Sequence, residues 1–229
     1  ATLTIALGIG ATTTIYSVVD GVVLRPLPYD DPSTLVAIGA IAPGASADPE
    51  TGLQDLSWVS FPGLNALRAR ARSFETVAAM GSYRFQESDE NGVQVFIPAA
   101  TVTGEVFPML GVAPALGRMF TPDELVFTGG MRVPVVILSH GYWQRRYGGD
   151  PAILGRTLEA VGTLDGARPT IVGVLPAGFE PPESFFPSGK LPEIYGPLAL
   201  PWTEDLTAQR RTAVYLNGLG RLAPGATVE

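Results

Sequence analysis

Apolar residues along this chain occur in runs and alternations that are interrupted by Gly, Pro, Asn and Asp, and this pattern predicts mostly strands. A continuous apolar run between turn residues, as at 34–41 and 133–138, is typical of a buried strand. The pair Asn91 and Gly92 tolerates positive φ and predicts a hairpin between two of the segments. The predicted strands are 34–41, 74–86, 93–102, 133–138, 156–161, 169–175 and 213–222.

A helix is predicted from Ser60 to about Arg72. Ser60 is a helix-capping residue, and a proline stands in the first turn, where a missing N–H costs nothing. Apolar residues recur at i, i+3 and i+7 from Leu64 and form one face. The arginines at 68, 70 and 72 then form a solvated face, with a patch for an anionic ligand as the alternative.

Shorter helical segments are predicted at three places. Residues 105–110 precede Gly111, which is placed to end a helix. Thr121 and Glu124 form a capping box around a proline. Residues 141–147 follow Ser139 as a cap and end at Gly148. Helices and hairpin strands in this order predict an α+β fold, with helices packed on mostly antiparallel sheets.

The N-terminal stretch is the most unusual one, because residues 1–19 carry no charge. As a helix they would rise roughly 28 Å, close to the thickness of the bilayer core. We therefore predict one membrane helix from about Thr2 to Val23. A buried helix of a water-soluble protein is the alternative, whereas a signal peptide would need a basic start that the sequence lacks.

Composition excludes several classes of protein. The net charge of −7 disfavours nucleic-acid binding, which needs a basic face against phosphates. The absence of cysteine excludes disulfides, thiolate catalysis and iron–sulfur clusters. A single histidine cannot build a multi-histidine metal site.

Candidate chemistry is sparse. Ser139 and His140 are the first pair to test as nucleophile and base, but neighbours in sequence rarely aim at each other, so a capping role for Ser139 is the favoured interpretation. The glycines at 8–13 lack the rest of a phosphate-loop motif. The acidic stretch 88–92 lacks calcium-loop spacing. We therefore predict no catalytic, cofactor-binding or metal-binding residue. A hydrolase with a cryptic site at Ser139, His140 and Asp150 is one alternative, and an envelope adhesion or binding module is another.

Five phrases in order resemble the MacB-like periplasmic core domain of FtsX-type ABC transporter permeases, in particular the bacterial permeases without a fused ATPase. No family counterpart is evident at 42–57 or 181–193. The phrases are LGIGATTTIYSVVDGVVLRPLPYDDPSTLV (7–36), VTGEVFPMLGVAPALGRMFTPDE (102–124), VPVVILSHGYWQRRYGGDPAILGRTL (133–158), TIVGVLPAGFEPP (170–182) and LGRLAPGAT (219–227).

The resemblance implies an architecture and a role. Residues 1–24 would be part of a transmembrane or stalk helix, residues 25–104 and 193–229 a porter-like α+β subdomain, and residues 105–192 an inserted Sabre-like α/β subdomain. The family's permeases sit in the inner membrane, with this region on the periplasmic side. A separate ATPase drives movement that exports or extracts a substrate. The implied partners are that ATPase, membrane lipid, envelope proteins and a second permease copy, with no cofactor.

Two structural expectations complete this picture. The strands at 34–41, 74–86, 93–102 and 213–222 should share one sheet, and the middle unit should have its own core of Val135, Ile137, Leu158, Ile171 and Val174. We place the candidate partner interface at Trp143, Arg145 and Arg146, although for Trp143 a position in the core is the favoured interpretation.

Overall fold

The structure is a computed structural model that describes residues 29–39, 59–88, 91–126, 135–162, 168–182, 186, 190–198 and 214–227. The helix predicted at 2–23 and most of the stretch 42–57 lie outside these residues. Within the described part of the chain, no helix is long and apolar enough to cross a membrane. The chain divides into Ala1–Ser33 and Thr34–Glu229, and the fold described below is that of the second unit.

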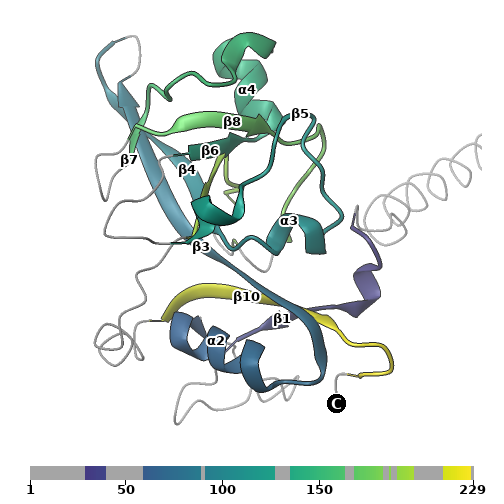
Figure 1. Cartoon of the computed structure of the whole chain (residues 1–229). Helices are drawn as coiled ribbons and strands as arrows, with labels where there is room; N and C mark the ends of the chain where they lie inside the picture. The colour runs from purple at the N-terminus through teal and green to yellow at the C-terminus, as the bar shows by residue number, and fades with distance from the viewer. Residues whose placement is uncertain are drawn as a thin grey trace, which may run out of the picture. The chain divides into compact units, whose positions relative to one another are not determined.

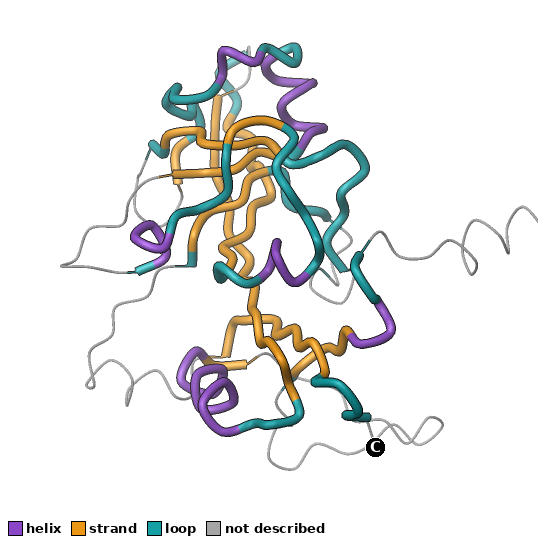
Figure 2. Tube along the Cα trace, turned by 45° about the vertical axis from the view of Figure 1, so that its right-hand side comes forward, coloured by secondary structure: helices purple, strands orange, loops and turns teal. Residues whose placement is uncertain are grey.

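The described residues of this unit form one mixed sheet with short helices, so the α+β prediction is confirmed (Figures 1 and 2). The helices are α2 (Phe61–Arg70), α3 (Val106–Met109) and α4 (His140–Tyr147), with 3₁₀ turns at Pro32–Thr34, Pro122–Leu125 and Pro151–Ile153. The strands are β1 (Leu35–Ile38), β2 (Val59–Ser60), β3 (Phe74–Ser88), β4 (Gln94–Val102), β5 (Leu116–Gly117), β6 (Val135–Leu138), β7 (Val161–Gly162), β8 (Thr170–Val174), β9 (Ile194–Pro197) and β10 (Val214–Leu222).

The first half of the sheet confirms the predicted shared sheet. Its order is β1-β10-β3-β4, and all these pairs are antiparallel. The β3–β4 hairpin pairs Met80 with Val102 at one end and Ser88 with Gln94 at the other. Gly92 has φ 78°, as the predicted turn requires. The burial predicted for β1 is wrong: its four residues are half-buried or exposed, because β1 lies at the end of the described strand order.

The second half of the sheet was not predicted in full. β9 pairs parallel to β4 and antiparallel to β6, and so joins the two halves. The pattern analysis missed it because its four residues, Ile194–Pro197, include a glycine and a proline. The strand predicted at 156–161 is also wrong, because the chain changes partners there. Thr157 makes an isolated bridge to β8, whereas Val161–Gly162 pairs with β3.

The helix signals are confirmed, with two corrections. The Ser60 hydroxyl accepts a hydrogen bond from the Gly63 N–H, and α2 buries Leu64. The helix ends at Arg70, two residues earlier than predicted. Arg68 does not lie on a solvated face: it donates to the Val77 carbonyl at 2.9 Å and pairs with Glu105 at 2.7 Å. The start of β3 lies under this side of the helix and supplies the carbonyl.

Two clusters of buried apolar residues hold the sheet, and β3 contributes to both. Val77 and Ala79 belong to the first cluster, beside α2, and Phe85 belongs to the second, beside α4. In the cartoon, α2 and α4 lie towards opposite ends of β3 (Figure 1). The first cluster is Val59, Leu64, Val77, Ala79, Leu198 and Leu216. The second is Phe85, Ile97, Ala99, Val136, Leu138, Tyr142, Ile153, Leu158, Ala160, Ile171, Val174 and Ile194.

All five residues predicted for the middle core are buried, but they do not form one cluster. Leu158, Ile171 and Val174 belong to the second cluster. Val135 and Ile137 alternate along β6 with two members of that cluster, so they face the other side of the sheet. Every residue of β6 is buried, which is typical of a strand covered on both faces. The second cluster also includes residues of β3 and β4, and the subdomain boundary at 105–192 stays a prediction.

Candidate functional site

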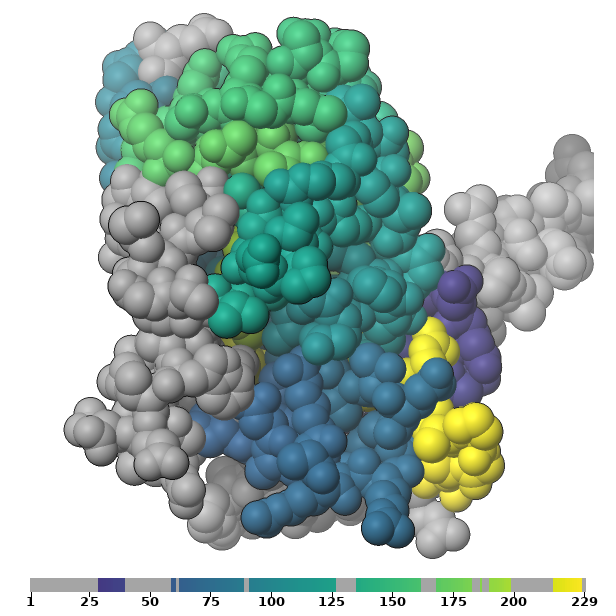
Figure 3. All heavy atoms as spheres, in the orientation of Figure 1, coloured from purple at the N-terminus to yellow at the C-terminus, as the bar shows by residue number. Residues whose placement is uncertain are grey.

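The predicted interface residues lie on α4, whose place is fixed by local sequence. The strand β6 leads directly to Ser139, whose hydroxyl accepts a hydrogen bond from the Tyr142 N–H at 3.1 Å. Gly148 ends the helix in the left-handed conformation, with φ 62°. Both helix signals in the sequence are therefore confirmed. In the space-filling view, the residues around α4 (green) are exposed at the surface (Figure 3).

Ser139 and His140 are engaged by different neighbours. The Ser139 hydroxyl caps the helix, and the His140 ring packs edge-on against the Trp143 ring, with centroids 5.4 Å apart. A nucleophile needs its base within hydrogen-bond reach and a third group to orient that base. The contacts recorded for these two residues supply neither element.

Trp143 serves as an anchor for α4. Its indole N–H donates to the Asp150 carbonyl at 3.0 Å, and its side chain packs partly buried against the second core cluster. This favours the core alternative for Trp143, because its polar atom is already bound within the chain.

The two arginines reach different acidic partners. Arg145 keeps 62% of its side chain exposed and pairs with Glu193 at 2.7 Å. Arg146 lies 3.4 Å from Glu87 and also pairs with Glu159. Burial lowers the pKa of Arg146, but attraction to Glu87 and Glu159 outweighs it, so the net pKa is raised. Arg145 is thus the member of the pair most available to a partner.

Two tyrosines beneath Arg146 were missed by sequence reasoning. Burial raises the pKa of both Tyr142 and Tyr147, and nearby carboxylates add to this effect. The Tyr142 hydroxyl lies 3.5 Å from Glu87, the same carboxylate that Arg146 approaches. Glu87 therefore links the end of β3 to α4. Nothing in a single sequence could signal this contact, because the partners are 55 residues apart.

A groove of about 730 Å³ runs beside the first turn of α4. Its lining includes His140 and Arg145 of α4, together with Phe179, Lys190 and Glu193. The lining mixes positive, negative and aromatic side chains, which is typical of a polar interaction surface.

Comparison with known proteins gives a match over the whole chain. The family of MacB-like periplasmic core domains matches residues 1–229. The chain belongs to this family.

Solved structures show the same fold for this MacB-like core domain. It is similar to the extracellular domain of the noncanonical ABC-type transporter YknZ from Gram-positive bacteria, with 16% identity, 82% of this chain and 83% of that chain covered, and a TM-score of 0.53. It is also similar to a domain of a protein described as a permease from Porphyromonas gingivalis, with 18% identity, 76% and 72% covered, and a TM-score of 0.51.

The periplasmic region of MacB from Actinobacillus actinomycetemcomitans is also similar in structure, with 11% identity, 80% of this chain and 74% of that chain covered, and a TM-score of 0.49. No curated protein matches the chain.

Metal-ligating side chains do not gather in the described part of this MacB-like core domain. Among those residues, no group of three or more His, Asp or Glu side chains is placed to hold a metal ion.

Proposed function

We propose that this MacB-like domain is the extracytoplasmic core domain of an ABC transporter permease. In this proposal it transmits movement driven by a separate ATPase to a substrate that is exported or extracted across the envelope. The observation that carries the proposal is the family match over residues 1–229. No contact among the described residues favours the alternatives of an envelope hydrolase or an adhesion module.

The sheet offers a physical basis for transmission. β3 has 15 residues, so it spans about 50 Å at roughly 3.3 Å per residue. It pairs with β10 over its first half and with β4 over its second. Because it enters both core clusters, force applied at one cluster would pass along a hydrogen-bonded strand to the other.

The remaining parts of the proposal come from the sequence and the family. We place residues 1–24 in membrane lipid of the inner membrane, with the rest of the chain on the extracytoplasmic side. Residues 25–104 with 193–229, and residues 105–192, are the two proposed subdomains. A dimer of permeases, a partner ATPase and envelope proteins complete the assembly. Comparing membrane partitioning of the chain with and without residues 1–19 tests the anchor.

We place the partner interface on α4, at Trp143, Arg145 and Arg146. Arg145 is its most exposed member, and a charged side chain at the rim of an interface steers and orients a partner. Trp143 would support this surface from below, through its packing on the second core cluster.

The proposal is tested in the intact permease with its ATPase. Replacing Arg145 and Arg146 by Glu should abolish transport and weaken envelope-partner binding, while the ATPase still copurifies. The matched control replaces two exposed arginines, Arg70 at the end of α2 and Arg72 just after it, by Glu and should leave transport unchanged. Arg145→Glu alone keeps the ion pair between Arg146 and the end of β3. It therefore tests the binding of the envelope partner without removing that stabilising contact.

Loss of transport from His140→Ala alone, in a folded and inserted protein, would contradict a purely mechanical domain. Failure of any ATPase to copurify with the permease would contradict the proposal as a whole.

A further inference from the structure

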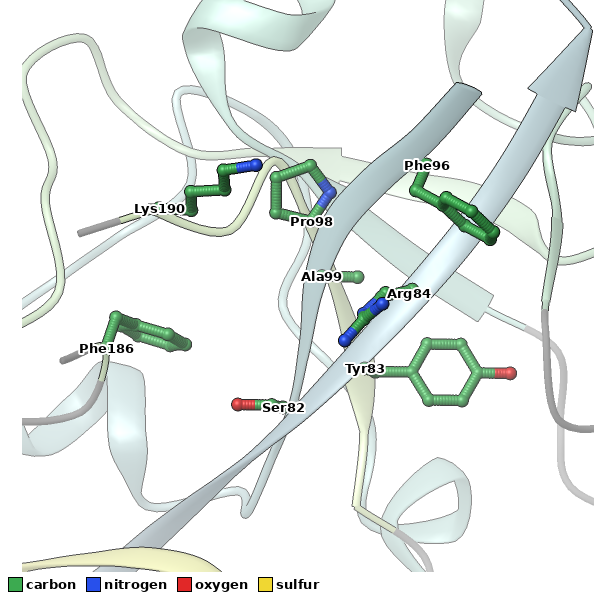
Figure 4. A pocket seen from close by; sticks show the side chains of 8 residues that line it. All are labelled: Ser82, Tyr83, Arg84, Phe96, Pro98, Ala99, Phe186 and Lys190. Carbon is green, nitrogen blue, oxygen red and sulfur yellow. The ribbon is translucent and has the colours of Figure 1, made fainter. Parts of the chain in front are cut away.

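The dipeptide Asn-Gly occurs twice in this chain, at residues 91–92 and 217–218, in very different surroundings. The first lies in the turn between β3 and β4. Figure 4 shows the two strands that lead to this turn, with Tyr83 and Arg84 on β3 and Phe96 on β4. The second lies in the middle of β10. Because both sites have the same pair of residues, a difference in their reactivity between the folded and the unfolded chain comes from the fold.

An asparagine that is followed by glycine can lose its side-chain amide in water. The backbone nitrogen of the glycine attacks the side-chain carbonyl carbon, the bond from that carbon to the side-chain nitrogen breaks, and ammonia leaves with the proton of the attacking nitrogen. Water then opens the resulting cyclic imide at either of its carbonyl groups. The product is an aspartate or an isoaspartate, in which the backbone continues through the former side chain. Glycine favours the first step because it has no side chain beside the attacking nitrogen and its backbone turns freely.

The fold leaves the site at 91–92 open to this reaction. Asn91, Gly92 and Val93 are exposed, and Gly92 has φ 78°, in the left-handed region. A Cβ added to Gly92 would meet nothing within 4 Å, so the space beside this residue is open. The interaction that Asn91 makes within the chain lies at this exposed turn, where water competes with it. The side-chain carbonyl of Asn91 and the nitrogen of Gly92 can therefore approach each other with local movement alone.

The site at 217–218 is held between two strands. Gly218 is paired with Ile38 of β1 on one side and with Ala79 of β3 on the other. Gly218 is also buried, and a Cβ added to it would lie 2.8 Å from the Ile38 carbonyl oxygen. In an antiparallel strand ψ is about +135°, which keeps the nitrogen of the following residue away from the side-chain carbonyl. The attack at Asn217 therefore requires that the strand pairing opens first.

We propose that Asn91 is a site of spontaneous deamidation in the folded protein, and that strand pairing protects Asn217. Water is the co-reactant, and no enzyme or cofactor takes part. Each conversion replaces a neutral amide by a carboxylate at a turn whose sequence already holds Asp89 and Glu90. An isoaspartate also adds a carbon to the backbone of this turn. The inference does not depend on the proposed transport function, because it concerns the chemistry of the chain alone.

Incubation of the full 229-residue chain at mildly alkaline pH tests the proposal, because base speeds the attack. Samples are taken over a period in which the circular dichroism spectrum stays that of the folded protein. Digestion at acidic pH limits further deamidation. Mass spectrometry of the peptides then gives the fraction converted at each asparagine, from the mass increase when OH replaces NH₂. The same chain unfolded in guanidinium chloride gives the reference rate of each site without the fold.

The two sites should respond differently to folding. Asn91 should convert in the folded chain at a rate within about threefold of its rate in the unfolded chain, because an exposed turn opens at almost no cost. Asn217 should convert at least about tenfold more slowly in the folded chain than in the unfolded chain. Asn65 of α2 is followed by alanine and should convert more slowly than Asn91 in both states.

Asn91→Gln is the matched variant. It keeps an amide at the exposed turn, but its longer side chain disfavours ring closure. The conversion at residue 91 should therefore disappear, and the rate at Asn217 should stay unchanged.

Two outcomes would overturn the inference. If the fold slowed conversion at Asn91 as much as at Asn217, the turn would not be open to the reaction. If both sites converted at equal rates in the folded chain, strand pairing would not protect Asn217.

Discussion

At the scale of the residue, Glu124 is the carboxylate with the most closely defined surroundings. It accepts hydrogen bonds from Arg118 at 2.7 and 2.8 Å and from the Thr121 N–H at 2.8 Å, and it completes the predicted capping box. The hydrogen bonds from Arg118 lower the pKa of Glu124, although burial opposes this. A carboxylate with a lowered pKa stabilises the fold above its unfolded pKa of about 4.3, and that contribution is lost as the pH falls through the folded value.

Glu124→Gln should therefore destabilise the protein by about 1–3 kcal/mol at pH 7, because charged hydrogen bonds to a buried group are lost. The difference from wild type should shrink as the pH falls below about 4. Urea unfolding followed by circular dichroism at several pH values measures both effects. Asp123→Asn, at the exposed neighbouring carboxylate, is the control and should change little. A difference that stays constant with pH would refute this account of Glu124.

Ser139 gives a second prediction at the residue scale, since a cap and a nucleophile respond differently to substitution. Ser139→Ala should cost about 1 kcal/mol of stability, and Ser139→Asp should restore it, because aspartate also caps helices well. Chemical denaturation measures the stability, and transport by the intact permease should survive in Ser139→Asp. If transport were lost in both variants while stability returned in Ser139→Asp, the hydroxyl would have a role beyond the cap.

At the scale of the element, the approach of β5 to β8 depends on a glycine. A Cβ added at Gly173 would lie 2.4 Å from the Arg118 carbonyl oxygen, which is backbone and cannot move alone. Gly173→Ala should therefore destabilise the protein by roughly 1–3 kcal/mol, as overpacking does. Gly196→Ala in β9 is the matched control, because a Cβ there meets nothing within 4 Å. Thermal unfolding of the two variants should differ clearly, and equal melting temperatures would refute the close-approach argument.

The elements that the sequence predicts well are those specified by neighbours along the chain. The Ser60 and Ser139 caps and the Asn91–Gly92 turn each depend on a few consecutive residues. By contrast, β9 becomes a strand only because β4 and β6 flank it. The same holds for the candidate site. The position of α4 can be predicted from the residues next to it in the sequence, whereas the pairing of Arg146 with Glu87 joins residues 59 positions apart and cannot.

At the scale of the whole molecule, we propose that the unit Thr34–Glu229 acts as a rigid element that carries movement. The sheet continues through β9, and β3 is shared by both core clusters, so the sheet cannot bend between them without disturbing strand pairing. A rigid element should keep its internal distances while its position relative to other subunits changes.

The most direct test measures these distances by spin labelling in the intact permease with its ATPase. These 229 residues contain no cysteine, so within them labels attach at the introduced Arg72→Cys and Arg156→Cys, both at exposed positions, and any cysteine elsewhere in the permease or the ATPase is replaced by serine. We predict that the distance between the two labels in one chain is the same with and without ATP, whereas the distance between identical labels in two permease copies changes. An ATP-dependent change within the chain, or no change between copies while transport proceeds, would contradict it.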